Sequence, residues 1–223
     1  MERHFEKELE KLKGKINLLF SLVTKSLESS IEAVMKNSEP HAKAVYEYEH
    51  SINSLELEID NGVVDLLALR QPVASDLRLI LAILKINNDL ERIGDHAVNI
   101  AESAQGLIET PEQEPLLKVP QMADHAMAML RDANQSFNEL NALLAQKVLE
   151  RDDIIDTMNR ELLAEVAQLI KEDQSTIEGN LQLARISRNL ERVADLTTNI
   201  AEEVIFYLQA RVVKHHAEEG NQK

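Results

Sequence analysis

Two stretches of the chain carry the same row of acids and amides, one hundred residues apart. The first row consists of Glu91, Asp95, Asn99 and Glu102, and the second of Glu191, Asp195, Asn199 and Glu202. On a helix, which turns about 100° per residue, side chains four, eight and eleven positions apart lie on one face. Carboxylate and amide oxygens are hard ligands that suit Mg²⁺, Ca²⁺, Mn²⁺ or iron. Each row is therefore a candidate metal site.

The alternative interpretation is a solvated surface, because any amphipathic helix has polar side chains opposite its apolar face. Carboxylates four residues apart nevertheless repel each other by a few tenths of a kcal/mol. Arg92 and Arg192 each follow the first acid of a row, and one residue turns the helix by about 100°, so we expect them to point away from the acids. Both copies keep the unrelieved row. This favours a cation site.

Other motifs for chemistry are weaker. Glu47 and His50 match the Glu-x-x-His motif of di-iron bundles, which requires a second copy of that motif. The corresponding region near Asp153 and Asp156 has no histidine. No glycine-rich phosphate loop or Ser-His-Asp arrangement is visible. We therefore predict a protein that is not an enzyme, with a ferritin-like or other metal-dependent enzyme and a plain helical scaffold as alternatives.

Long helices must position these rows, because apolar residues recur at steps of three and four along most of the chain. The first helix is expected to end near Asn37 and the second to run from Pro40 to just before Pro72. A capping box at Ser175 and Glu178 is expected to open the last helix. The remaining boundaries predict helices over about 75–106, 117–147, 152–171 and 175–213.

The chain is an internal duplication. An offset of 100 gives eight identities in the thirteen positions 90–102, and an offset of 103 aligns 52–55 with 155–158. Two prolines mark a linker between the copies. We therefore predict an all-α fold of six long helices in two pseudo-symmetric three-helix bundles. The expected divisions are a first bundle at 1–110, a linker at 111–115, a second bundle at 116–214 and a flexible tail at 215–223.

Composition narrows the function classes. The 223 residues include no cysteine and carry a formal charge of −15, which excludes disulfides and thiolate metal sites and disfavours nucleic acid as a partner. No apolar run approaches the roughly 20 residues that span a bilayer. We expect a cytoplasmic protein without direct membrane insertion.

Longer motifs resemble those of one known family. Residues 88–102 read NDLERIGDHAVNIAE, residues 189–202 read NLERVADLTTNIAE, and residues 70–78 read RQPVASDLR. The first two resemble the paired Glu/Asp-x-x-x-Asp signatures of the PhoU family, and the third resembles the turn into that family's third helix. The likeness extends over nearly the whole chain.

The resemblance implies a function as well as a fold. It implies multinuclear metal clusters on the acidic rows, with iron expected and Mg, Mn, Ca or Zn as alternatives. It also implies a negative regulator of phosphate uptake and of the phosphate-starvation response. The implied partners are the ATPase subunit of the phosphate ABC transporter and a sensor histidine kinase. We expect a homodimer that is peripheral to the inner membrane because these partners bind it there.

The signature acids carry over by position. Glu91, Asp95, Glu191 and Asp195 match them, and Asn99, Glu102, Asn199 and Glu202 extend them. Asp156 is an expected contributor from the neighbouring helix, whereas the first half has Asn53 at that position. This difference predicts unequal metal loading of the two rows.

Overall fold

Helices make up almost all of the chain that the computed structural model describes, namely residues 2–70, 72, 74–110 and 118–211. They are α1 (Glu2–Met35), α2 (Glu39–Arg70), α3 (Ala74–Ile108), α4 (Lys118–Asn138), α5 (Ala142–Leu149), α6 (Asp152–Glu172) and α7 (Ile177–Gln209). A 3₁₀ turn at Gln174–Thr176 precedes α7. These described residues contain no β-strand. The all-α prediction is confirmed.

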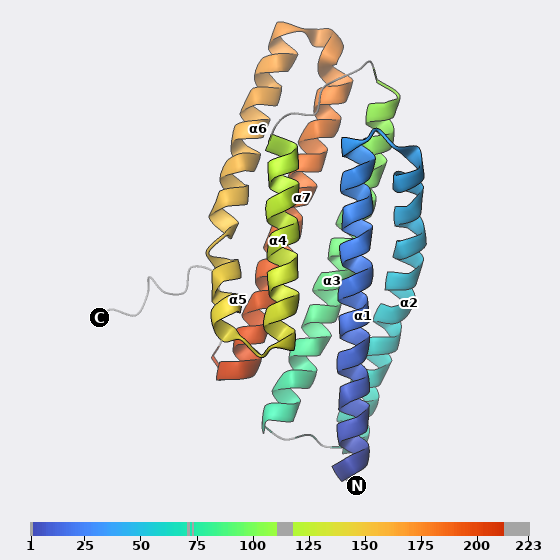
Figure 1. Ribbon diagram of the computed structural model, residues 1–223, viewed down its shortest axis with the longest axis vertical. Helices are drawn as coiled ribbons and strands as arrows, with labels where there is room; N and C mark the ends of the chain where they lie inside the picture. Colours follow the sequence, from blue (N-terminus) through green and yellow to red (C-terminus); the bar gives the residue numbers. More distant parts are fainter. Residues whose placement is uncertain (1, 71, 73, 111–117, 212–223) are drawn as a thin grey trace, which may run out of the picture.

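Each half buries one face of every long helix. On α1 the apolar residues Ile16, Leu19 and Val23 are fully buried, as their spacing of three and four requires. The helices α1, α2 and α3 pack together, and α4 to α7 form the second unit. In Figure 1, α1 and α4 lie over α3 and α7, while α2 and the α5–α6 pair occupy the two edges. The duplication predicted from sequence is confirmed.

The predicted helix over 117–147 is wrong, because the chain turns after Asn138. The backbone N–H of Asn141 donates to the carbonyl of Ser136 at 2.9 Å, and Leu140 has a φ of 53°. This left-handed residue ends α4 in a Schellman motif, and the side chain of Asn141 then caps α5. Together α5 and α6 form one broken rod that corresponds to α2.

The predicted capping box before α7 is also wrong. Asp173 accepts hydrogen bonds from the backbone N–H and the hydroxyl of Ser175, so Ser175 lies in the 3₁₀ turn. Thr176 precedes α7 without capping it through its side chain. The helix end predicted near Val213 is wrong, because α7 ends at Gln209 and Ala210 has a left-handed φ of 54°. The expected linker at 111–115 and the tail at 215–223 lie outside the described residues.

The two halves meet along α3 and α7, which run antiparallel through the middle of the molecule (Figure 1). Residue numbers along the contact therefore run in opposite directions. Lys85 Nζ lies 2.7 Å from Glu203 Oε1 at one end, and Arg185 Nη2 lies 3.8 Å from Glu102 Oε2 at the other. Among the described helices, none has the length and apolarity that crossing a bilayer requires.

Candidate functional site

Three aspartates gather between α6 and α7. Asp152 and Asp156 are one turn apart on α6, and Asp195 faces them from α7. Each offers a carboxylate oxygen, and these oxygens all lie within 4.8 Å of one another. All three residues are partly buried. Oxygens at this spacing can bind one hard divalent cation together.

Glu191 lies one turn before Asp195 on α7 and adds a fourth carboxylate. Burial raises its pKa, and the negative charges of Asp195 and Asp156 raise it further. Its Oε2 atom is buried and accepts no hydrogen bond. A buried carboxylate oxygen without a hydrogen bond has unused capacity for a cation. The donor set in this half therefore fits a metal ion.

Arg192 does not point away from the acids as the helix geometry predicted. Its Nη1 atom lies 2.9 Å from Asp195 Oδ2, and its Nε atom lies 3.6 Å from Glu191 Oε2. The long side chain bends along the helix surface to the residue three positions on. One guanidinium thus partly neutralises two of the four acids.

The first half has a looser acidic cluster between α2 and α3. Burial raises the pKa of Glu91, and the charges of Asp95, Glu56 and Glu49 raise it further. Asn53 lies on α2 between Glu49 and Glu56 and is exposed. Among the described residues, the Asp152, Asp156 and Asp195 group is the one triad of acids that meets the 4.8 Å spacing.

The remaining predicted residues lie elsewhere. Glu102 is exposed and faces Arg185 of α7 at 3.8 Å, and the partly buried Asn99 lies one turn before it on α3. The side chain of Asn199 hydrogen-bonds to Asp89 across the α3–α7 contact. Glu202 lines a hollow of about 510 Å³ with residues of α2 and α3. The predicted row on α7 is thus divided between the two halves.

Two acids of these clusters, Glu49 and Asp152, were not predicted from the sequence. The offset of 103 aligns them with each other, so the duplication could have indicated both. The buried Asp89, outside these clusters, has no acid at the aligned position and could not have been found in this way. Burial raises its pKa to about 6, although Arg92 and the hydrogen bond from Asn199 act in the opposite direction.

Comparisons with known proteins agree with the fold and the duplication. The family model described as PhoU domain matches residues 16–104 and 119–204. A relative from Aquifex aeolicus, named phosphate-specific transport system accessory protein PhoU homolog, is 36% identical over 94% of this chain and 95% of its own length. These matches cover both halves.

Solved structures match as well. The crystal structure of PhoU from Pseudomonas aeruginosa has a TM-score of 0.90 at 34% identity, covering 93% of this chain and 100% of that one. The phosphate transport system regulatory protein PhoU from Streptococcus pneumoniae has a TM-score of 0.88 at 30% identity, covering 95% and 100%. The family model and the relatives span most of the sequence. The chain therefore belongs to the PhoU family.

Proposed function

We propose that this protein is a regulatory accessory protein of phosphate transport that restrains uptake and the phosphate-starvation response when phosphate is plentiful. It acts as a cytoplasmic, metal-binding adaptor, as a homodimer, between the ATPase subunit of the phosphate ABC transporter and a sensor histidine kinase. Support comes from the names of its relatives, which place them in the phosphate-specific transport system. The role requires no catalysis, because an adaptor acts by binding.

The metal-binding part of the proposal is carried by the acidic triad and by Glu191. Asp152, Asp156, Glu191 and Asp195 would hold the ion in the second half, and Glu49, Glu91 and Asp95 would do so in the first half. A bound cation supplies positive charge and oxygen coordination that offset the repulsion between these carboxylates. The ligands come from two helices in each half, so their arrangement can join α6 to α7 and α2 to α3.

Metal binding is tested on protein purified without an affinity tag. Asp195→Asn keeps the size of the side chain but removes one charged ligand, so we expect it to reduce the iron or other metal bound, measured by elemental analysis. Asp153→Asn is the matched control, because Asp153 is exposed and lies outside the triad. Equal metal content in all three proteins contradicts the metal site.

Regulation is tested in cells and with purified partners. Deletion of the gene is expected to switch on a phosphate-starvation reporter at high phosphate, and the wild-type gene is expected to switch it off again. The purified protein is expected to bind the transporter ATPase subunit and the cytoplasmic part of the kinase. Silence of the reporter in the deletion strain contradicts the repressor role, and turnover of ferrous iron or oxygen by the protein favours the ferritin-like alternative.

A further inference from the structure

The outward side of α2 carries an uncharged, partly apolar row, here called the α2 outer stripe and defined as Leu57, Asn61, Val64 and Ala68. At about 100° per residue these four side chains fall within roughly 60° of one another, opposite the buried face. Leu57 is 61% exposed and Val64 62%. The helix lies at the edge of the molecule, and it packs on α1 and α3 (Figure 1).

The fold itself does not require apolar residues at these positions. The offset of 103 aligns Leu57 with Arg160 and Ala68 with Lys171 on α6, and both basic residues are exposed there. The same position of the same three-helix unit thus accepts a charge. The exposed Leu57 and Val64 therefore have no large apolar counterpart at the aligned positions of α6, which hold Arg160 and Ala167. Neighbouring exposed apolar residues are a mark of interaction sites.

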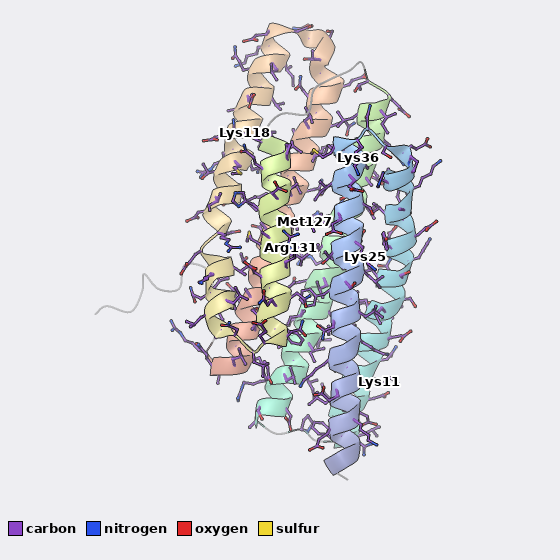
Figure 2. The ribbon with its side chains drawn as sticks, in the orientation of Figure 1. Lys11, Lys25, Lys36, Lys118, Met127 and Arg131 are labelled. Carbon is purple, nitrogen blue, oxygen red and sulfur yellow. The ribbon has the colours of Figure 1, made fainter. Side chains whose placement is uncertain are left out.

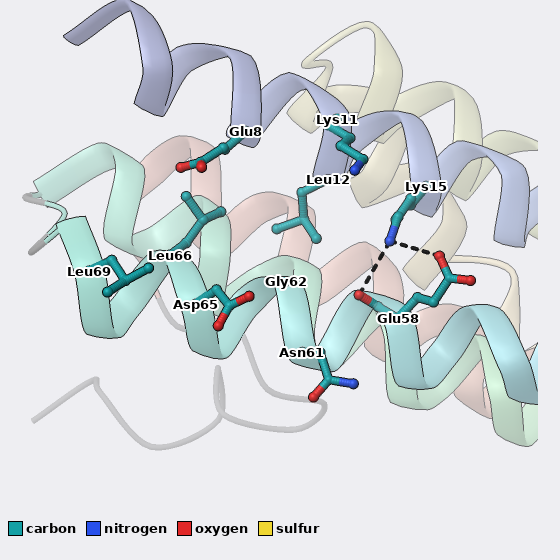
Figure 3. A pocket seen from close by; sticks show the side chains of 10 residues that line it. All are labelled: Glu8, Lys11, Leu12, Lys15, Glu58, Asn61, Gly62, Asp65, Leu66 and Leu69. Atoms are coloured by element: carbon teal, nitrogen blue, oxygen red, sulfur yellow. Dashed lines mark hydrogen bonds and ion pairs between the residues drawn. The ribbon is translucent and has the colours of Figure 1, made fainter. Parts of the chain in front are cut away.

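A groove beside the stripe gives this surface depth. It lies between α1 and α2 and has a volume of about 410 Å³. Its apolar lining is Leu12, Leu66 and Leu69, and charged side chains also line it, namely Glu8, Lys11, Lys15, Glu58 and Asp65 (Figure 3). A Cβ atom at Gly62 would lie 3.3 Å from Leu12 Cδ1, so the glycine lets the two helices approach closely. Leu69 is 70% exposed at the rim. An apolar side chain of a partner fits such a groove.

The charges around the stripe are one-sided. Between residues 44 and 69 the helix carries no Lys or Arg and six acids, namely Glu47, Glu49, Glu56, Glu58, Asp60 and Asp65. Among the described residues, one of the six has a Lys or Arg partner within 4.0 Å, since Lys15 Nζ lies 2.9 Å from Glu58 Oε2 (Figure 3). The basic residues of α2 that bound this window, Lys43 and Arg70, pair with Glu39 and Glu8. Figure 2 labels Lys11 and Lys25 on α1.

These acids favour one kind of binding partner for the stripe over others. A second copy of the chain would bring the same acids against themselves, and like charges in contact are costly. A membrane surface with anionic lipids would be repelled as well. A helix with an apolar ridge between rows of Lys or Arg complements both the stripe and its border.

We propose that the α2 outer stripe and the adjoining α1–α2 groove dock an amphipathic helix of a partner protein, with an apolar ridge bordered by Lys or Arg. The inference rests on the proposed adaptor function and gives that function a docking surface. The partner's ridge covers Leu57 and Val64, and one apolar side chain enters the groove over Leu66. One basic row faces Glu47 and Asp65 on the groove side of the stripe, and the other faces Asp60 on the opposite side.

The experiment measures binding of the full-length protein to the purified transporter ATPase subunit and to the cytoplasmic part of the kinase. Leu57→Arg copies the residue of the sister helix, so it is expected to leave the fold intact, as checked by thermal unfolding. It is expected to weaken binding of at least one partner by about tenfold or more. Leu181→Arg is the control, because Leu181 is 51% exposed on α7, and it is expected to bind as wild type does.

The outcomes separate this inference from the proposed function. If wild type binds and Leu57→Arg binds equally well, the docking surface is wrong and the adaptor role stands. If wild type binds neither partner, the adaptor role fails and the docking surface fails with it. Sedimentation and vesicles containing anionic lipid complete the test. Loss of self-association or of vesicle binding in Leu57→Arg would assign the stripe to a second copy or to lipid and overturn the proposal.

Discussion

Asp89 is a buried carboxylic acid, and burial disfavours its charged form. Burial raises the pKa of Asp89 in the folded state to about 6, from an ordinary value of 3.8. The folded state therefore binds more protons than the unfolded state between these two values. Asp89 therefore contributes most to stability below its ordinary pKa, and this contribution is lost as the pH rises through about 6. We expect Asp89→Asn to be more stable than wild type at neutral pH, because the amide carries no charge to bury.

The measurement is urea unfolding at pH 4 and pH 7.5 with a chelator present. The advantage of Asp89→Asn is expected at pH 7.5 and to shrink at pH 4, where the carboxyl group is largely protonated. Asp153→Asn, on the exposed side of α6, serves as the control and is expected to show no such difference. An equal effect of Asp89→Asn at both pH values would show that desolvation of its charge is not the cause.

The surroundings of a single residue can be predicted from the sequence only where its neighbours lie on the same helix. The spacing of Glu191 and Asp195 is local, so it could be recognised without a structure. The raised pKa of Asp89 depends on its burial at the α3–α7 contact, which no local pattern encodes. Arg192 was misplaced because helix angles locate the Cβ atom, whereas a long side chain chooses its rotamer by the charges within its reach.

At the scale of the element, the turn between α4 and α5 has an unfavourable residue. Leu140 has a φ of 53°, where a non-glycine residue costs roughly 1–2 kcal/mol. The equivalent turn after α1 has Asn37 at a φ of 50°, and asparagine tolerates this region better. We expect Leu140→Gly to raise the free energy of unfolding by about 1 kcal/mol, measured by urea denaturation.

Leu143→Gly is the matched control. Leu143 is also exposed but lies in the first turn of α5, where glycine is a poorer helix former than leucine. The two glycine substitutions are therefore expected to change stability in opposite directions. A loss of stability in both variants would mean that the left-handed backbone at Leu140 is not a source of strain.

This turn also shows why helix boundaries were predicted incompletely. Apolar residues continue through it at helical spacing, as Ala133, Phe137, Leu140 and Leu144 do, so periodicity alone predicts one continuous helix. The duplication contains the missing information. The offset of 103 aligns Leu140 and Asn141 with Asn37 and Ser38, at which the first half plainly turns.

At the scale of the whole molecule, the repeat predicts two similar halves but not how they meet. The contact is made by the signature helices themselves, α3 and α7, in antiparallel orientation. It brings Asn199 to Asp89 and Lys85 to Glu203. These pairs join residues more than one hundred positions apart, so their arrangement depends on packing that neither half specifies alone. For this reason the acidic row on α7 is divided, with Glu191 and Asp195 facing α6 and Asn199 and Glu202 facing the first half.

The two halves also differ in their acids, which leads to the last prediction. On α6, Asp152 and Asp156 complete the triad with Asp195, whereas α2 has Glu49 and Asn53 at the corresponding positions. An amide is a weaker ligand than a carboxylate for a hard cation because it carries no charge. We expect Asn53→Asp to raise the affinity or the number of metal ions bound in the first half, measured by elemental analysis after competition with a chelator.

Ser54→Asp provides the control for added charge alone, because Ser54 is the exposed neighbour on the same helix and turns about 100° away. Equal metal binding by Asn53→Asp and Ser54→Asp would show that position 53 is not a ligand site and that the halves differ for another reason. A gain confined to Asn53→Asp would mean that one carboxylate separates a tight site from a weak one. The two halves would then bind metal with different affinities because of a single residue. The first half also differs from the second in its outer surface, where Leu57 and Val64 of α2 are exposed to a partner.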